Sequence, residues 1–355
     1  FLRYLEVEGM KTDEKNYIFV DEIQYMDNPT NFLKQIADHH RYLKIVCSGS
    51  STLDIRRKFT DSLAGRKVVF EIPTLTFREF LQFRGEGTLS GLLKDFPFDA
   101  GIGGMPLDIH RKQLETYYEQ FLIYGGYPAI VLENDREKKL RLLSDIYESY
   151  VRKDINQLFT IENIMAFNNL VKLLALQIGN LVNMQELTSS LAISRPTLEK
   201  YVSILENTFI LKLVTPFFSN KRKEIVKMPK LYYHDTGMRN QAVRNFQPLS
   251  LRSEMGALVE NMIFKALTVH LSPLEELKFW RTKGGSEVDF VIEGERVVPV
   301  EVKYTGMRSP QIPLGLRSFI QSYNPQMGVV VTRDFMDEVK VNGTKVIFMP
   351  AFLLS

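Results

Sequence analysis

The sequence contains very little cysteine, since Cys47 is the single cysteine among its 355 residues. An internal disulfide is therefore excluded, and a reducing, cytoplasmic compartment is expected. Because Cys47 ends an apolar run (Leu43–Cys47), we predict a buried thiol. The chain also lacks any apolar stretch near the ~18 residues that a membrane-spanning helix requires. It has no recognisable signal peptide, so no membrane partner is expected.

Charge of either sign is not in large excess, because 45 Lys and Arg residues stand against 42 Asp and Glu residues, a net charge of +3. That balance neither requires nor excludes binding to nucleic acid. The clustering of the basic residues is therefore the relevant signal for such binding. The length predicts two or three domains. The chain begins with Phe1 and enters secondary structure almost at once, so we expect it to be part of a longer protein.

The first 84 residues alternate between short apolar runs and amphipathic runs. The expected strands are Tyr17–Val20, Leu43–Cys47 and Lys67–Ile72. The expected helices are Asn28–His40, Thr52–Ser62 and Thr76–Phe83. Continuous apolar strands separated by helices indicate an α/β fold with a parallel sheet covered on both faces.

Two carboxylates, Asp21 and Glu22, follow the first expected strand directly. At that end of a parallel strand an aspartate can hold Mg²⁺ and the next glutamate can activate a water. Ser48 and Ser50 follow the second strand and could bind the γ-phosphate of ATP; the alternative is a plain Ser/Gly turn. Arg66 could reach a phosphate in a neighbouring subunit; the alternative is a surface arginine.

Together these residues resemble the ATPase module of a bacterial and archaeal AAA-type family. The matching stretches are YIFVDEIQYM, IVCSGSS, SLAGRKVVFEIPTLTFREFL and YGGYPAIV. The resemblance implies ATP and Mg²⁺ as cofactors and a homo-oligomer formed through the ATPase module. It also implies a C-terminal domain long described as one of unknown function. The P-loop of that family, GxxxxGK[ST], occurs nowhere in this sequence, so we expect this chain to lack ATPase activity although the intact protein binds ATP.

The middle of the chain has a helix-turn-helix pattern. Asn183 is placed to cap one helix, and Ser194 with Pro196 is typical of the start of the next. Exposed residues at the start of that second helix could contact DNA: Arg195, Thr197 and Lys200.

A β-like pair, Ile210–Pro216 and Lys230–His234, follows the two helices and completes a winged-helix pattern. Between its strands lies a basic run, Lys221, Arg222 and Lys223, with Lys227 and Lys230 beyond. On a wing this run would meet DNA phosphates. The alternative is a solvated hairpin in a winged helix that only packs against protein.

Charged residues interrupt two apolar strands near the C-terminus. Strand alternation places Glu301 and Lys303 on one face, where Asp289 on the preceding strand can meet them. Glu260, on a preceding helix, could complete a site for Mg²⁺ or Mn²⁺, with Lys303 as the catalytic lysine. The alternative is a surface Glu–Lys pair.

The spacing D-x11-E-x-K after a helical glutamate resembles the PD-(D/E)XK nuclease superfamily, although Val288 replaces the usual proline. We therefore expect four parts. They are a partial P-loop ATPase core (1–84), a helical connector (85–160), a winged helix (161–245) and a nuclease-like α/β domain (246–355).

Three functions remain open at this stage. The first is an ATPase coupled to DNA binding and metal-dependent phosphodiester cleavage. The second is an ATP-regulated DNA-binding switch whose nuclease-like domain is inactive. The third is an interaction protein whose C-terminal domains serve as oligomerisation surfaces.

Overall fold

The structure is a computed structural model that describes residues 2–49, 65–93, 107–154, 161–218 and 227–354. The chain divides into two compact units. The first comprises Phe1–Ile72 with Ser203–Phe209, and the second comprises Pro73–Val202 with Ile210–Ser355. Within the described ranges, no helix is both long enough and apolar enough to cross a membrane.

The first unit is built around two parallel strands. Its elements are α1 (Leu2–Val7), β1 (Asn16–Val20), a 3-10 turn (Ile23–Tyr25), α2 (Pro29–His39) and β2 (Leu43–Cys47). The strands pair in register from Asn16 opposite Leu43 to Val20 opposite Cys47. Asn28 caps α2 by accepting a hydrogen bond from the backbone of Asn31, and proline occupies the first helical position. Both strand predictions and the α2 prediction are confirmed.

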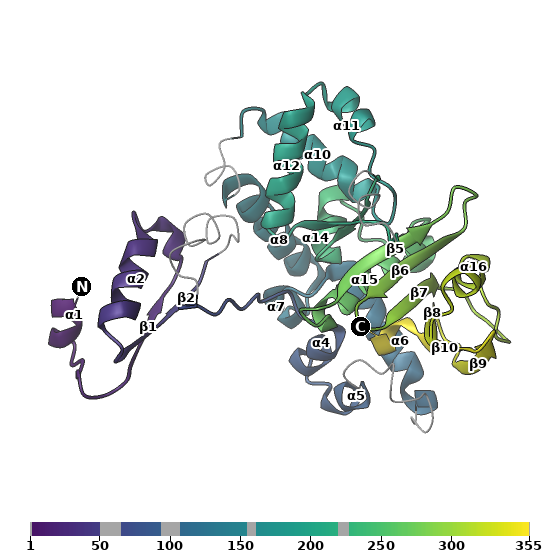
Figure 1. Ribbon diagram of the computed structural model, residues 1–355, viewed down its shortest axis with the longest axis horizontal. Helices are drawn as coiled ribbons and strands as arrows, with labels where there is room; N and C mark the ends of the chain where they lie inside the picture. Colours follow the sequence, from purple (N-terminus) through teal and green to yellow (C-terminus); the bar gives the residue numbers. More distant parts are fainter. Residues whose placement is uncertain (1, 50–64, 94–106, 155–160, 219–226, 355) are drawn as a thin grey trace. The chain divides into compact units, whose positions relative to one another are not determined.

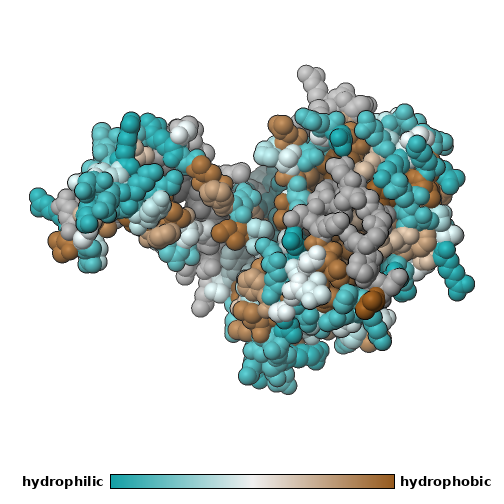
Figure 2. Space-filling model, turned by 90° about the horizontal axis from the view of Figure 1, so that it is seen from below, coloured by the Kyte–Doolittle hydropathy of each residue, from teal (hydrophilic) through white to brown (hydrophobic). Residues whose placement is uncertain are grey.

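The prediction of a third strand at Lys67–Ile72 is wrong, because the described residues there form no strand. Its β-branched and aromatic residues favour an extended chain, but a strand also requires a hydrogen-bonding partner. Phe70 and Ile72 are 82% and 93% exposed instead. Phe19 of β1 is 77% exposed, so the described part of the sheet is not covered on both faces. Hydrophobic residues are visible at the surface of this unit (Figure 2).

Two further predictions for the first unit have different outcomes. The expected helix at Thr52–Ser62 lies outside the described residues. Cys47 is half-buried rather than fully buried, and this burial raises the pKa of its thiol.

A series of helices opens the second unit. They are α4 (Phe77–Phe83), α5 (Gly87–Leu92), α6 (Leu107–Tyr124), α7 (Pro128–Leu132), α8 (Arg136–Tyr147) and a π-helical turn (Glu148–Asp154). The helix predicted at Thr76–Phe83 is confirmed as α4, and Thr76 caps it through a reciprocal capping box with Glu79. Two glycines lie between α6 and α7. Gly125 has a φ of 78°, and a Cβ on Gly126 would lie 2.5 Å from the carbonyl oxygen of Leu75.

Three helices and a small sheet follow (Figure 1). They are α10 (Ile164–Leu176), α11 (Met184–Leu191), α12 (Arg195–Asn207), β3 (Leu211–Val214) and β4 (Lys230–Tyr233), and then come α14 (Thr236–Val243) and a 3-10 turn (Leu249–Leu251). Asn183 and Ser194 accept hydrogen bonds at the starts of α11 and α12, which confirms both predicted caps. β3 and β4 are antiparallel, with Leu211 opposite Tyr233. The expected order of helices and strands is therefore present.

The C-terminal part packs helix α15 (Met255–His270) against a six-stranded sheet. Its strands are β5 (Glu276–Arg281), β6 (Glu287–Glu293), β7 (Val297–Lys303), β8 (Met327–Thr332), β9 (Asp337–Val341) and β10 (Thr344–Pro350). Their order is β5-β6-β7-β8-β10-β9, and β7, β8 and β10 are mutually parallel. Helices α16 (Leu314–Tyr323) and α17 (Ala351–Leu354) complete this part. The two strands predicted to carry Asp289 and Glu301 are confirmed as β6 and β7, whereas β5 was not predicted.

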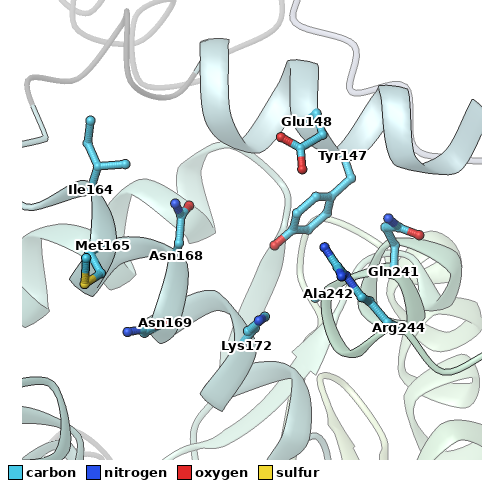
Figure 3. Close-up of a pocket in the computed structure, with 10 residues that line it drawn as sticks. All are labelled: Tyr147, Glu148, Ile164, Met165, Asn168, Asn169, Lys172, Gln241, Ala242 and Arg244. Atoms are coloured by element: carbon cyan, nitrogen blue, oxygen red, sulfur yellow. The ribbon is translucent and has the colours of Figure 1, made fainter.

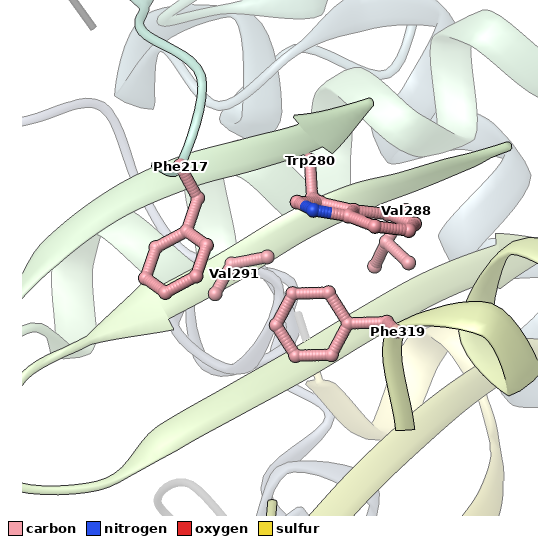
Figure 4. Packing of buried hydrophobic residues seen from close by; sticks show 5 residues of the cluster. All are labelled: Phe217, Trp280, Val288, Val291 and Phe319. Carbon is pink, nitrogen blue, oxygen red and sulfur yellow. The ribbon is translucent and has the colours of Figure 1, made fainter. Parts of the chain in front are cut away.

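An aromatic cluster anchors β5 and β6 to α16 (Figure 4). Phe217, Trp280, Val288, Val291 and Phe319 are all buried and pack together. The rings of Trp280 and Phe319 meet edge to face, 5.3 Å apart. Trp280 therefore has a packing role, and this cluster fixes β6, which carries candidate site residues.

Candidate functional site

The ends of β1 and β2 bring two predicted ATP-site residues together. The Ser48 hydroxyl donates a hydrogen bond to Asp21 Oδ1. The backbone N–H of Glu22 lies 3.1 Å from Asp21 Oδ1 and 3.3 Å from Ser48 Oγ. Glu22 has a left-handed backbone with a φ of 51°, a conformation that costs energy for a residue other than glycine. Asp21, Glu22 and Ser48 thus share one edge of the sheet.

The other two predicted residues of this region are not part of that group. Ser50 lies outside the described residues. Arg66 Nε lies 2.7 Å from Asp38 Oδ1, and Asp38 belongs to α2 of the same unit. The Arg66 side chain is 40% exposed, so its guanidinium contacts a carboxylate of its own chain at the protein surface.

The candidate DNA-binding residues of α12 are placed at the start of the helix, as predicted. Arg195 is exposed and forms an ion pair of 2.8 Å with Glu199. Lys200 is also exposed and lies 3.9 Å from Glu162. Thr197 Oγ1 is 2.8 Å from the hydroxyl of Ser194. Both basic side chains are therefore accessible, and each has an acidic neighbour.

The predictions for the basic residues beyond α12 have two different outcomes. Lys221, Arg222 and Lys223 lie outside the described residues. The assignment of Lys230 to the same exposed run is wrong, because Lys230 is only 2% exposed. It is the first residue of β4 and points into the protein towards carboxylates.

Lys230 lies at the centre of a group of acidic side chains. Its Nζ is 3.2 Å from Glu260 Oε1, 2.5 Å from Glu287 Oε1 and 3.4 Å from Asp289 Oδ1. Glu260 is carried by α15, whereas Glu287 and Asp289 are two residues apart on β6 and therefore share a face. We call Glu260, Glu287, Asp289 and Glu301 the acidic cluster. The contacts of Glu260, Glu287 and Asp289 with Lys230 were not predicted from the sequence.

Glu301 and Lys303 form the second part of the acidic cluster, on β7. The pairing of β6 with β7 places Phe290 opposite Val300, so the next residues along, Asp289 and Glu301, face each other. Lys303 Nζ lies 2.9 Å from Glu301 Oε1. The backbone N–H of Val302 donates a hydrogen bond of 2.8 Å to Asp289 Oδ2, which fixes that carboxylate. Asp289, Glu301 and Lys303 therefore meet as their spacing predicts.

The acidic cluster carries perturbed pKa values. Burial, and then the charge of Asp289, raises the pKa of Glu260 and that of Glu301. Burial lowers the pKa of Lys303, but Glu301 and Asp289 outweigh it and hold that pKa above its usual range. Glu301 is 5% exposed, and its Oε2 has no hydrogen-bond partner among the described residues. Unpaired, buried carboxylate oxygens are the donors that Mg²⁺ and Mn²⁺ bind.

The acidic cluster is nevertheless not a preformed metal-binding site. In the described parts of the chain, no three Asp, Glu, His or Cys side chains form a group that could hold a metal ion. Two ammonium groups, those of Lys230 and Lys303, already lie against the carboxylates. The donor chemistry fits a divalent cation, and in this conformation the compensating positive charge comes from lysine.

A separate cavity of about 500 Å³ lies between helices of the second unit (Figure 3). Its polar lining includes Asn168 and Lys172 of α10 and Gln241 and Arg244 at the end of α14. None of the site residues predicted from the sequence lines it. Sequence patterns do not bring these residues together, because they come from elements about 70 residues apart in the chain.

Three stretches of the chain match known sequence families. Residues 2–81 match an AAA domain, so the first unit has the sequence of an AAA-type module. Residues 255–352 match a domain of unknown function, DUF4143, which contains all four residues of the acidic cluster. Residues 115–249 match a second domain of unknown function, DUF8612.

The chain is also similar to uncharacterized proteins along most of its length. One from Methanocaldococcus jannaschii is 28% identical over 292 residues, which cover 81% of this chain and 60% of that protein. One from Haemophilus influenzae is 21% identical, with coverage of 100% and 81%. One from Mycobacterium tuberculosis is 24% identical, with coverage of 85% and 61%. The chain therefore spans about 60% of the length of two of these relatives.

Among solved structures, the chain aligns with one from a Thermococcus gammatolerans assembly of McrB AAA+ hexamers with bound McrC. The two are 11% identical, and the alignment covers 95% of this chain and 96% of the other. The TM-score is 0.29, which is too low to indicate a shared fold.

Proposed function

We propose that this chain is part of an AAA-type ATPase whose C-terminal domain cleaves phosphodiester bonds of DNA with the help of Mg²⁺ or Mn²⁺. The observation that carries the proposal is the arrangement of Asp289, Glu301 and Lys303. The carboxylates of Asp289 and Glu301 face each other across β6 and β7. One oxygen of Glu301, Oε2, is buried without a partner, and Lys303 Nζ lies 2.9 Å from the other, Oε1. Buried charges at adjacent strand positions are costly unless they serve a purpose.

Each residue of the acidic cluster has a separate part in this chemistry. A bound divalent cation would supply positive charge for the attacking and leaving oxygens of the phosphodiester. Asp289 and Glu301 would hold that cation, and the Val302 N–H orients Asp289 for the task. Glu260 would add a third carboxylate from α15. The half-exposed Lys303 ammonium would offset phosphate charge or position the water.

The AAA match supports an ATPase-type activity for the protein that contains this chain. In that protein Asp21 would bind Mg²⁺ through water, Glu22 would activate the attacking water and Ser48 would contact the nucleotide. Arg66 would reach a phosphate of a neighbouring subunit, which requires that it leave Asp38. The sequence printed here has no GxxxxGK[ST] motif, so we expect this chain alone to hydrolyse no ATP.

The middle of the second unit would bind the DNA substrate. Helices α10, α11 and α12 followed by β3 and β4 have the element order of a winged helix. The exposed Arg195 and Lys200 at the start of α12 would contact phosphates.

DNA cleavage tests the proposal. The chain would be incubated with supercoiled and linear DNA and either Mg²⁺ or Mn²⁺, beside Asp289→Asn and Lys303→Met. Glu338→Gln is the matched control, since Glu338 lies on β9 of the same sheet and pairs with Lys345. We expect nicking by the wild type and the control, and a loss of about 100-fold or more in both site variants. Nicking that persists in Asp289→Asn would overturn the proposal.

A second function is favoured by the contacts of Lys230. Because this ammonium already pairs with three carboxylates and offsets part of their charge, the domain could be a DNA-binding module that holds no metal and has no nuclease activity. Tight DNA binding without cleavage, and without any divalent-cation binding, would support this ATP-regulated switch over the nuclease.

A further inference from the structure

We propose that Lys230 competes with a divalent cation for the acidic cluster, so that its ammonium must withdraw before a metal ion can bind. The inference rests on the metal site of the proposed function and adds a residue that regulates it. The supporting observation is that one buried ammonium contacts Glu260, Glu287 and Asp289 at 3.2, 2.5 and 3.4 Å.

Lys230 has the environment of a bound cation rather than of a surface side chain. Its side chain is 3% exposed, and the ring centroid of Phe279 lies 5.7 Å from Nζ. A charge buried to this extent persists only where opposite charges surround it. The three carboxylates come from two elements, α15 and β6, and the ammonium comes from a third, β4. The fold therefore builds a cation-binding position, and a residue of the chain itself occupies it.

The backbone on either side of Lys230 is fixed by hydrogen bonds. The N–H of Val182 donates to the carbonyl of Pro229 at 2.8 Å, and the N–H of Leu231 donates to the carbonyl of Asn180 at 3.2 Å. β4 also pairs with β3 along its length. Withdrawal of the ammonium thus requires a change of side-chain rotamer, while the strand stays in place.

A metal ion and the Lys230 ammonium cannot share these oxygens at low cost. Both would lie within a few ångströms of Asp289, where like charges repel strongly because the surroundings are buried. The unpaired, buried Oε2 of Glu301 shows that the two lysines do not satisfy the acidic cluster completely. A divalent cation that gains Glu301 and Asp289 must therefore displace Lys230 from Asp289.

Binding of Mn²⁺ alone to the full chain tests the inference without any measurement of activity. Free Mn²⁺ would be followed by electron paramagnetic resonance in titrations of the wild type and Lys230→Met. Lys278→Met is the matched control, because Lys278 is also buried, lies on β5 and pairs with Glu276. We expect Lys230→Met to bind Mn²⁺ about tenfold more tightly than the wild type, and the control to bind like the wild type.

A double variant locates the gained affinity. Adding Asp289→Asn to Lys230→Met should abolish the gain if the metal enters the acidic cluster. Equal affinity of the wild type and Lys230→Met would overturn the inference and leave the proposed metal site intact. Failure of both proteins to bind Mn²⁺ would overturn the inference and the proposed metal site together.

A measurement on the wild type covers the case in which Lys230→Met does not fold. Amine-reactive labelling with mass spectrometry would compare the modification of Lys230 and Lys278 with and without saturating Mn²⁺. We expect the modification of Lys230 to rise several-fold with Mn²⁺ and that of Lys278 to stay constant. Unchanged modification of Lys230 would show that no displacement occurs and would overturn the inference.

Discussion

Lys265 gives a quantitative prediction about the helix that carries Glu260. It lies five residues further along α15, and its ammonium donates hydrogen bonds to Thr74 Oγ1 at 2.6 Å and to the carbonyl of Leu75 at 2.7 Å. Asp235 is 3.9 Å away. Burial lowers the pKa of Lys265 from 10.5 to about 8. The ammonium therefore destabilises the folded state relative to a neutral amine.

The sign and size of the pH dependence follow from this lowered pKa. Between pH 8 and 10.5 the unfolded chain holds more of this proton than the folded chain, so stability rises with pH over that interval. The free-energy cost of burying the Lys265 ammonium is fully present below pH 8 and disappears as the amine deprotonates. From pH 7 to pH 9.5 the gain is about 2 kcal/mol. Lys265→Met removes the titrating amine. The free energy of unfolding of the wild type should therefore rise by about 2 kcal/mol relative to that of the variant over that range.

Urea unfolding at several pH values measures this difference. Trp280 is the single tryptophan of the sequence and is buried in the second unit, so its fluorescence reports the unfolding of that unit. Lys138→Met, which removes an exposed lysine of α8, should follow the wild type. A difference between the wild type and Lys265→Met that stays constant or falls as the pH rises would refute the reasoning.

Three further predictions concern the acidic cluster, the connector and the DNA-binding surface. Because burial raises the pKa of Glu301, Glu301→Gln should raise stability by about 1–3 kcal/mol at pH 8 and leave it unchanged at pH 5, in thermal unfolding at both values. Gly126→Ala should lower stability by about 1–3 kcal/mol in the same assay, because its Cβ would meet a carbonyl oxygen at 2.5 Å; Gly91→Ala, with open space around it, should not. Substitution of both Arg195 and Lys200 by alanine should weaken DNA binding, measured by fluorescence anisotropy. The slope of log affinity against log salt concentration should fall by an amount that corresponds to about two phosphate contacts. An unchanged slope would exclude both residues as phosphate contacts.

Local sequence patterns predicted those elements whose cause is local. The Asn28 cap, the capping box at Thr76 and the alternation around Asp289 each depend on residues close together in the chain. Lys67–Ile72 has the composition of a strand, but its pairing depends on a partner that local composition does not specify. β5 was missed because its charged residues, including Lys278, interrupt the apolar pattern.

The candidate site was predictable to the extent that strand geometry defines it. Alternation on β7 placed Glu301 beside Lys303, and the spacing between strands placed Asp289 opposite them. The role of Lys230 was not predictable from the basic residues near it, because its burial depends on the packing of β4 against α15 and β6. A lysine within the otherwise apolar strand KLYY was the one signal of that role in the sequence.

The central claim is that the acidic cluster binds a divalent cation, and anomalous diffraction from crystals of Lys230→Met grown with Mn²⁺ tests it most directly. The account predicts an anomalous peak between the carboxylates of Asp289 and Glu301, in contact with both. A map with no peak at the acidic cluster, or with Mn²⁺ bound only elsewhere on the chain, would contradict it.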